Sequence, residues 1–413
     1  MLQNTEIDTN NNMKTRVWLA CLTTILIAKW GMAQELYDVN ITIQNRDQSS
    51  HIGEQFFITG AFNGWKPAAV LVGAIPKYGE TIQVTIPSVP KGLFEYKFTR
   101  GNWETLASTA KGNLEGPIKL IVTGDTAVTA TIDGWRDDFP ASTASPQVHI
   151  LDSAFYFPKL DVQRRVWIYL PEGYAQSKES YPVIYMHDGQ DLFDEATSKG
   201  RIGPLEWRVD EAIDEAKDKA IVVAIAHAED IQRRQNEYFV RPTTSFPQPL
   251  GEAYLQDIVS VLKPYVDQHY RTKSDRAHTA MAGSSVGGLL TFYASLLHPE
   301  TFGTVGVLSP SIWLDEGNID QAIAQIPVKD ASLTPDFYFY GGGNENRIKP
   351  DGSRVRMHDD IERIIQMMQN SGREKIQVSI EPDGRHGAWY WQKAFPYFYS
   401  WWTSQFSQND NQS

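Results

Sequence analysis

One serine of this chain lies in a pattern that is typical of nucleophilic catalysis. Ser285 is the centre of residues 283–287 (GSSVG), which match G-x-S-x-G. The pattern places a serine on a sharp turn between a strand and a helix, and its glycines leave room for the strained backbone. An apolar run precedes the turn, and residues 288–297 continue it with helical character. We therefore predict that Ser285 is exposed at a strand end as the nucleophile of an acyl transfer.

A serine nucleophile needs a general base, and His386 is the best candidate. It follows the last predicted strand and precedes the final aromatic helix. Loops beyond the carboxyl ends of strands are where such sheets place their chemistry. His278 stands at the wrong end of the serine's strand, and His358 falls on a predicted helix surface.

The base in turn needs an acid, for which Glu345 is the first choice. Glu345 directly follows a predicted strand and falls between the serine and the histidine in the chain. Asp351 and Asp359 are rivals further along, whereas Asp383 is only three residues from His386, which makes a well-aligned contact to the ring difficult. The order serine, acid, histidine is the one that this kind of turn usually accompanies.

Two backbone N–H groups are expected to form an oxyanion hole. One belongs to Val286, the residue after the nucleophile, and the other to Gln190, in the loop after the strand at 181–187. The alternative for Gln190 is a simple turn after a strand.

The elements that must position these groups fall into two regions. Residues 35–138 show short alternating runs without a convincing amphipathic helix, which indicates a small all-β sandwich. Residues 139–147 are polar and flanked by proline, as in a linker, and 406–413 form a polar tail. Between them, 148–405 alternate apolar strands with helical segments, which predicts an α/β domain with a mostly parallel sheet covered on both faces. The helices are expected at 207–217, 254–269, 286–297, 359–369 and 389–402.

The first 33 residues resemble a secretory signal segment. Lys14 and Arg16 precede an apolar run at 17–28, and small residues follow it, with cleavage expected after Ala33. Met13 is an alternative start, and an uncleaved N-terminal anchor is the alternative interpretation. The single cysteine, at position 21, lies in this segment, so a mature chain would have no cysteine for a disulfide or a thiolate metal site. We expect a secreted or periplasmic protein.

Charge and motifs exclude several classes of partner. The formal net charge of −12 argues against nucleic acid and against an anionic membrane as a partner of the mature chain, because both require a basic face. No H-E-x-x-H or similar spacing is present, and the chemistry above requires no metal or organic cofactor.

With these residues assembled, 148–402 resemble the esterase D-like family of α/β-hydrolases. The matching stretches are YPVIYMHDGQDLFD, Arg234-x-x-Glu237-Tyr238, MAGSSVGG, SPSIW, YGGGNEN and GRHGAWYW. The resemblance implies an α/β-hydrolase fold with Ser285, His386 and Glu345 as triad. Family members often carry aspartate at the acid position. The resemblance also implies that Trp313, Trp389 and Glu237 contact substrate, although the two tryptophans could equally be core aromatics.

The N-terminal region resembles glycogen- and starch-binding modules of the carbohydrate-binding 20/48 type. The match is TGAFNGW at 59–65, followed by FEYKF at 94–98 and RGNWE at 100–104. It implies that Trp65 and Trp103 stack on sugar faces and that Lys97 bonds to hydroxyl groups. The alternative is a purely structural role, or a role as a wall of the active site.

Together these observations predict a serine carboxylic-ester hydrolase that forms an acyl-enzyme. Its expected substrates are acyl esters of carbohydrate, of the acetyl or feruloyl type, either small molecules or polysaccharides. The alternatives are a siderophore esterase of the ferric-enterobactin type, an acyltransferase and a non-catalytic glycan-binding protein.

Overall fold

The computed structural model describes residues 35–48, 51–200, 203–326, 333–349 and 352–410. The predicted signal segment 1–33, with Cys21, and the rival acid Asp351 lie outside the described residues. Among the helices of the described ranges, none combines the length and the apolar character that crossing a membrane demands.

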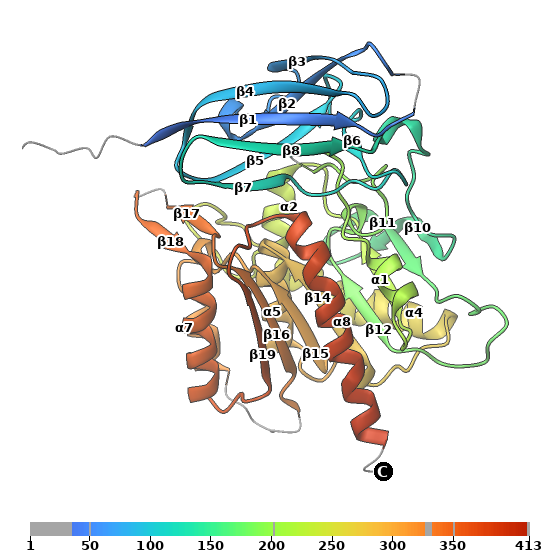
Figure 1. Ribbon diagram of the computed structural model, residues 1–413. Coiled ribbons are helices and arrows are strands. Elements are labelled where there is room, and N and C mark those ends of the chain that lie inside the picture. The colour runs from blue at the N-terminus through green and yellow to red at the C-terminus, as the bar shows by residue number, and fades with distance from the viewer. Residues whose placement is uncertain (1–34, 49–50, 201–202, 327–332, 350–351, 411–413) are drawn as a thin grey trace, which may run out of the picture.

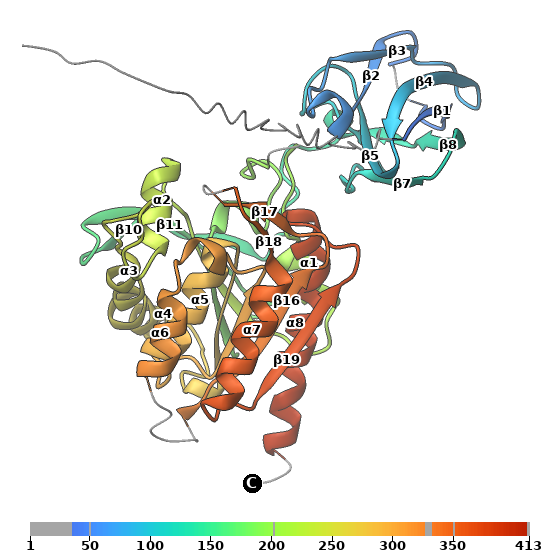
Figure 2. The same cartoon turned by 90° about the vertical axis from the view of Figure 1, so that its left-hand side faces the viewer.

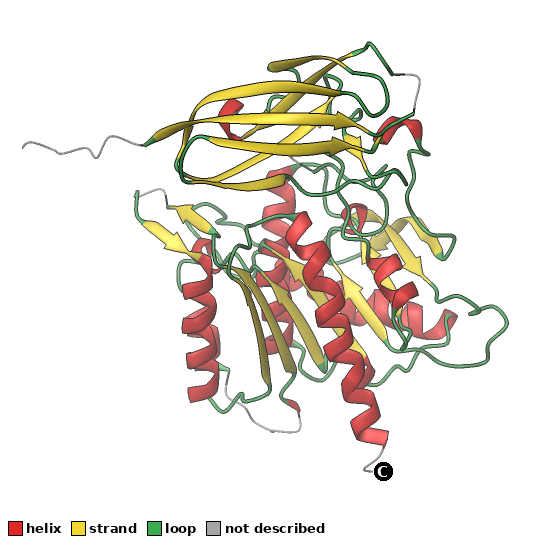
Figure 3. Ribbon diagram, viewed as in Figure 1, coloured by secondary structure: helices red, strands yellow, loops and turns green. Residues whose placement is uncertain are grey.

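The N-terminal region is a sandwich of two sheets, as predicted (Figures 1 and 3). One sheet has the order β4-β1-β8 and the other the order β3-β2-β5-β7. Their facing apolar side chains form one core, in which Phe56 packs edge-on against Trp135. The strands are β1 (Leu36–Asn45), β2 (Gln55–Gly60), β3 (Val70–Ala74), β4 (Thr81–Pro90), β5 (Gly92–Thr99), β7 (Ile118–Val122) and β8 (Thr126–Ile132), with a small pair β6 (Ala107–Ser108) and β9 (Gly134–Trp135).

The second region is built on an eight-stranded sheet of order β10-β11-β13-β12-β14-β15-β16-β19. The six strands from β13 to β19 in this order run parallel, whereas β10 and β11 are antiparallel additions at one edge. The strands are β10 (Val148–Phe157), β11 (Val162–Tyr169), β12 (Val183–Met186), β13 (Ile221–Ile225), β14 (Thr279–Ser284), β15 (Thr304–Leu308), β16 (Asp336–Gly342) and β19 (Ile376–Glu381). A hairpin of β17 (Asn346–Ile348) and β18 (Arg354–Arg356) stands apart from the sheet.

Helices cover both faces of this sheet (Figures 1 and 2). Side chains of β16 show why both faces need cover: Phe337 and Phe339 pack on Phe292 of one helical layer, while Tyr338 packs on Phe398 of the other. The first layer contains α3 (Gly251–Asp257), a π-helical turn (Ile258–Leu262), α4 (Lys263–His269), α5 (Val286–Leu297), α6 (Asn318–Gln325) and α7 (Met357–Asn370). The second contains α1 (Val209–Glu215) and α8 (Ala388–Asp410). The predicted α/β-hydrolase architecture is confirmed.

Several elements differ from the sequence prediction. The final helix α8 continues to Asp410, well past the expected end at 402 and into the expected polar tail. The strands β1, β3 and β10, the β17–β18 hairpin and the helices α2 (Ile231–Tyr238) and α6 were not predicted. Helix α2 carries mostly polar side chains (IQRRQNEY), so its sequence has no apolar periodicity to reveal a helix.

The sandwich lies against the carboxyl edge of the large sheet, near the start of α8 (Figures 1 and 2). Two ion pairs join the regions: Arg136 with Glu195 at 2.5 Å and Arg385 with Glu95 at 2.7 Å. Lys119 also donates a hydrogen bond to the hydroxyl group of Tyr390. The guanidinium of Arg136 additionally donates to the carbonyls of residues 140 and 141, so the start of the linker is folded onto the interface.

The turn between β14 and α5 has the strained geometry that its sequence predicts. Ser285 adopts φ 57° and ψ −122°, a conformation that costs a non-glycine residue on the order of 1–3 kcal/mol. Its N–H donates to the carbonyl of Leu308 on β15 at 3.0 Å. A Cβ added at Gly283 would lie 2.8 Å from the carbonyl oxygen of Gly287, and one at Gly288 would lie 2.7 Å from that of Leu308. At Gly287 the nearest atom is 3.4 Å away, so the second tight position after Gly283 is Gly288 and not Gly287, the last glycine of the motif.

These contacts predict different effects of alanine at neighbouring positions. Gly288→Ala should lower the free energy of unfolding by roughly 1–3 kcal/mol, because the methyl group would overlap backbone that cannot move freely. Gly287→Ala should change it by less than about 1 kcal/mol, because alanine favours the helix and fits the space. Urea denaturation of both variants, followed by far-UV circular dichroism, measures the difference. Equal losses in both would contradict the packing argument.

Candidate active site

Ser285, His386 and Glu345 form a hydrogen-bonded series at the carboxyl ends of three strands. The Nε2 atom of His386 lies 2.9 Å from Oγ of Ser285, and its Nδ1 atom lies 3.3 Å from Oε2 of Glu345. The serine follows β14, the glutamate follows β16 and the histidine follows β19, so three separate crossovers bring the groups together. The spacing fits the geometry of a nucleophile, a base and an orienting acid.

Glu345 is fully buried and held by two donors on its other oxygen. Oε1 accepts hydrogen bonds from Oγ of Ser309 at 2.6 Å and from the N–H of Gly342 at 3.1 Å. These donors leave Oε2 directed at the histidine ring. Of the rival acids, Asp359 is paired with Arg356 on the first turn of α7.

The surroundings of His386 keep its ring neutral. Burial lowers the pKa of His386 from its usual value of 6.5, and the hydrogen bond that its ring donates to Glu345 opposes part of that shift. The carboxylate partner assigns the proton to Nδ1, since only a donor can face Oε2. Nε2 is then an acceptor for the hydroxyl group of Ser285, which is the state of a general base.

Three side chains that sequence reasoning missed, Trp391, Ser309 and Ser311, support this series. Trp391 donates from Nε1 to Oγ of Ser309 at 3.0 Å, and its ring lies edge-on to His386 at 5.0 Å. The hydroxyl group of Ser311 lies 3.1 Å from that of Ser285. Both serines belong to the SPSIW stretch after β15, but the sequence offers no sign that their hydroxyl groups face the triad.

The loop after β12, which carries the expected second oxyanion donor, is fixed by a buried ion pair. Arg234 forms two hydrogen bonds to the carboxylate of Asp188, at 2.7 and 2.8 Å, and Tyr238 adds a third at 3.2 Å. Burial alone would raise the pKa of Asp188, but Arg234 overrides it and lowers the pKa to about 2. The side chain of Gln190 accepts from the N–H of His227 at 3.1 Å, which holds the loop on its other side.

The same loop lies against the nucleophile turn. A Cβ at Gly287, one residue after Val286, would lie 3.4 Å from Oδ2 of Asp188 and 3.6 Å from Cβ of His187. Val286 is the first residue of α5. Asp188 and His187, at the start of the loop that carries Gln190, therefore pack against the first turn of α5, which begins with Val286.

A cavity of about 720 Å³ opens at His386 between the two regions. Trp389 lines it from the catalytic side, and Trp65 and Glu95 line it from the sandwich. The predicted substrate residue Trp389 and the predicted sugar-binding residue Trp65 therefore share one cavity with the histidine. Arg385, which pairs with Glu95, also lines it, although sequence reasoning had not assigned it a role.

Other predicted site residues lie elsewhere. Glu237 is 1% exposed and ion-paired with Arg164 and Arg233, each at 2.6 Å, so its prediction as a substrate contact is corrected. Trp313 is partly buried, follows Ser311 by two residues and does not line the cavity at His386.

Lys97 and Trp103, the other two residues that were expected to contact sugar, do not share the cavity of Trp65. Lys97 is 6% exposed, and burial lowers its pKa to about 8 against the opposing effect of Glu195. Trp103 lines a separate cavity with Arg136 and Glu195. The three residues therefore do not form one open sugar-binding face in this structure.

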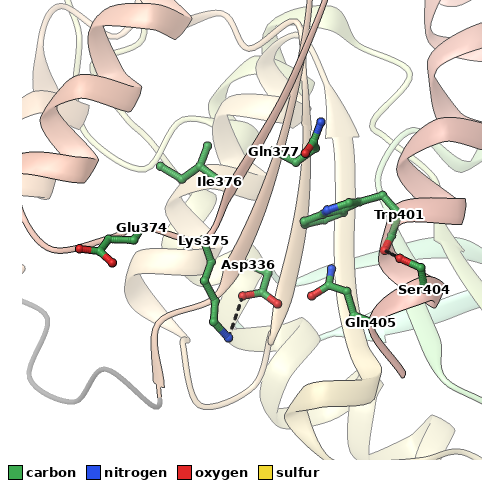
Figure 4. Close-up of a pocket in the computed structure, with 8 residues that line it drawn as sticks. All are labelled: Asp336, Glu374, Lys375, Ile376, Gln377, Trp401, Ser404 and Gln405. Carbon is green, nitrogen blue, oxygen red and sulfur yellow. Dashed lines mark hydrogen bonds and ion pairs between the residues drawn. The ribbon is translucent and has the colours of Figure 1, made fainter. Parts of the chain in front are cut away.

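A further hollow of about 500 Å³ lies at the opposite end of the sheet (Figure 4). Its floor carries the ion pair of Lys375 with Asp336 at 3.3 Å, and Trp401 of α8 forms one side. Asp336 is the first residue of β16, whereas the triad groups follow the last residues of their strands. This hollow is therefore separate from the active-site candidate.

Similar proteins have been found by sequence and by structure. The chain is 26% identical over 240 residues to the uncharacterized protein YbbA of Bacillus subtilis, covering 56% of this chain and 89% of that protein. It is 30% identical over 153 residues to an endo-1,4-β-xylanase/feruloyl esterase of Xylanibacter ruminicola, covering 36% of this chain and 20% of that protein. The solved enterobactin esterase FES of Shigella flexneri has the same fold, with a TM-score of 0.51, 16% identity and coverage of 89% of this chain and 94% of that one.

A family model described as "Putative esterase" matches residues 158–397, which is more than half of the chain. The match contains the nucleophile turn, the glutamate and the histidine. The chain therefore belongs to this esterase family, and it is a carboxylic-ester hydrolase.

Proposed function

We propose that the chain hydrolyses esters by a Ser285–His386–Glu345 triad through an acyl-enzyme. The observation that carries this proposal is the 2.9 Å contact between Nε2 of His386 and Oγ of Ser285. In the first half-reaction the serine oxygen attacks the ester carbonyl carbon while Nε2 takes the hydroxyl proton. Nε2 then gives that proton to the alcohol as the carbon–oxygen bond breaks.

In the second half-reaction, water replaces the alcohol. His386 takes a proton from the water, the resulting hydroxide attacks the acyl carbon, and the proton returns to Ser285 as the acid leaves. In each step the negative charge on the carbonyl oxygen is stabilised by the N–H groups of Val286 and Gln190. Glu345 does not exchange a proton; it orients the ring and stabilises its cationic form.

The cavity supports an acyl ester of carbohydrate as substrate. Its volume of about 720 Å³ falls in the range of pockets that enclose most of a drug-sized ligand. Trp65 and Trp389 offer aromatic faces, which suit both a feruloyl ring and the apolar face of a sugar. The relative from Xylanibacter ruminicola, an endo-1,4-β-xylanase/feruloyl esterase, supports the same class. In this proposal the sandwich is a wall of the active site, and the signal-like segment at 14–33 supports export.

The role of the nucleophile is tested with two adjacent serines. Ser285→Ala should lower kcat/KM for p-nitrophenyl acetate by roughly 10³-fold or more and abolish labelling by a fluorophosphonate probe. Ser284→Ala is the matched control, because it changes the neighbouring serine of the same motif, and it should still be labelled. Full labelling of Ser285→Ala would contradict the assignment.

The pH profile tests the histidine and its acid together. Because the base must be neutral and burial holds the pKa of His386 below 6.5, kcat/KM should be constant at neutral pH and fall only as the pH drops through that lowered value. Glu345→Gln removes the charge that raises this pKa, so the acid limb should move to lower pH while the plateau falls by up to roughly 10⁴-fold.

Asp359→Asn, at the half-buried rival carboxylate, is the control for the profile and should match the wild type. If the acid limb of the kcat/KM profile shifts in Asp359→Asn but not in Glu345→Gln, the acid is Asp359 and not Glu345.

The wall role of the sandwich is tested with two of its tryptophans, Trp65 and Trp103. Trp65→Ala should raise KM for a feruloylated oligosaccharide by roughly 3- to 10-fold, because an aromatic contact is worth about 0.5–1.5 kcal/mol. It should leave p-nitrophenyl acetate hydrolysis nearly unchanged, since that substrate is too small to reach across the cavity. Trp103→Ala, in the other cavity, should affect neither. Equal KM values in Trp65→Ala and Trp103→Ala would contradict the role of the sandwich as a wall of the active site.

A comparison of substrates tests the substrate class. Faster hydrolysis of an enterobactin-type lactone than of any sugar ester would favour a siderophore esterase.

A further inference from the structure

Three carboxylates gather beside the linker, away from the triad. Glu206 precedes α1, and Asp210 and Glu211 lie in its first turn. One oxygen from each residue lies within 4.8 Å of the corresponding oxygens of the other two. Glu206 is 1% exposed and Asp210 is fully buried, so water does not screen their mutual repulsion.

Each carboxylate has one oxygen with a protein donor and one without. Glu206 Oε1 accepts from the hydroxyl group of Thr143 at 2.6 Å, Asp210 Oδ2 from the N–H of Ser145 at 2.8 Å, and Glu211 Oε1 pairs with Arg208 at 3.2 Å. The second oxygens, Oε2 of Glu206, Oδ1 of Asp210 and Oε2 of Glu211, are buried and accept no hydrogen bond from any residue that the structure describes. Buried, unsatisfied carboxylate oxygens carry a high free-energy cost.

The residues that the structure describes supply few cationic partners for these three carboxyl groups. Arg208 is the ion-pair partner of Glu211, but within the ranges that the structure covers neither Glu206 nor Asp210 has one. The nearby Arg136 is already paired with Glu195. Of the three carboxyl groups, Glu211 alone therefore has a cationic partner among the described residues, and the unsatisfied oxygens of the two deeply buried residues mark the place for a cation.

We propose that Glu206, Asp210 and Glu211 bind a Ca²⁺ ion. The ligands are all oxygens, which hard cations prefer. Three protein carboxylates favour Ca²⁺, which takes such ligands at about 2.3–2.6 Å in a flexible geometry, over Mg²⁺, which usually keeps several waters and binds one or two carboxylates. The role is structural and separate from ester hydrolysis.

The bound ion would fasten the linker to the catalytic region. Thr143 and Ser145 belong to the linker, and they hold the oxygens of Glu206 and Asp210 that face away from the ion. Each of these two carboxylates would thus bridge the ion and the linker. Because the sandwich forms one wall of the cavity at His386, the ion would stabilise the arrangement of the two regions.

Terbium luminescence tests the site directly. Tb³⁺ replaces Ca²⁺ at oxygen sites, and the neighbouring Trp207 can transfer excitation energy to it. Tb³⁺ added to chelator-treated full-length protein should give sensitised emission that CaCl₂ reverses and that an equal concentration of MgCl₂ does not. Glu206→Gln and Asp210→Asn should each reduce the emission at least about tenfold. Glu215→Gln, the same change at an exposed carboxylate of α1, is the matched control and should retain it.

Thermal unfolding gives a second readout. CaCl₂ should raise Tm of the wild type and of Glu215→Gln by roughly 2 °C or more, and it should leave Tm of Glu206→Gln unchanged. Circular dichroism establishes that each variant is folded. If Asp210→Asn does not fold, Glu206→Gln and the Ca²⁺ competition decide. Emission that survives in folded Glu206→Gln, or a wild-type Tm that ignores CaCl₂, would overturn the proposal, whatever the esterase assays show.

Discussion

The turn from β14 to α5 constrains everything around it, because its backbone is held where a non-glycine residue is strained. At φ 57° and ψ −122°, Ser285 depends on its neighbours to stay in place. The carbonyl of Leu308 accepts the N–H of Ser285, and the same carbonyl lies so close to Gly288 that no side chain fits between. Strand β15 must therefore pair beside β14 in one register, and α5 must start at one position. This packing fixes the serine hydroxyl before any partner is considered.

From that fixed point, the other groups are placed by the order of the parallel sheet. Strands β14, β15, β16 and β19 are consecutive neighbours in the sheet, so their carboxyl ends deliver Ser285, Ser309, Glu345 and His386 in a row. The glutamate is two strands from the nucleophile and spans the gap with help from Ser309 on the strand between them. Trp391 then closes the series from α8 by donating to that serine. The buried charge of Glu345 is thus satisfied by its own neighbours while one oxygen remains for the histidine.

The sequence predicted the features that follow local rules. Helix α5 spans the residues expected for it, since the G-x-S-x-G turn marks its start and its apolar side chains continue without a break. Glu345 and His386 could be proposed from the sequence because each follows an apolar strand within a few residues. Glu237 was assigned wrongly, because its partner Arg164 is 73 residues away in the chain and nothing local reveals that ion pair. Ser309 and Trp391 were missed for the same reason: their roles depend on which strands and helices meet.

The N-terminal region contains the residues of the sugar-binding motif, but the structure does not place them on one open face. The aromatic positions expected to bind sugar are present, yet Trp65 and Trp103 line different cavities that face the catalytic region, and Lys97 is buried. Two ion pairs between described residues, Arg136 with Glu195 and Arg385 with Glu95, fix the sandwich against the catalytic region. The linker adds a third tie through Thr143 and Ser145 on acidic partners. Because Arg385 and Glu95 also line the cavity at His386, their ion pair both holds the sandwich in place and forms part of the cavity wall.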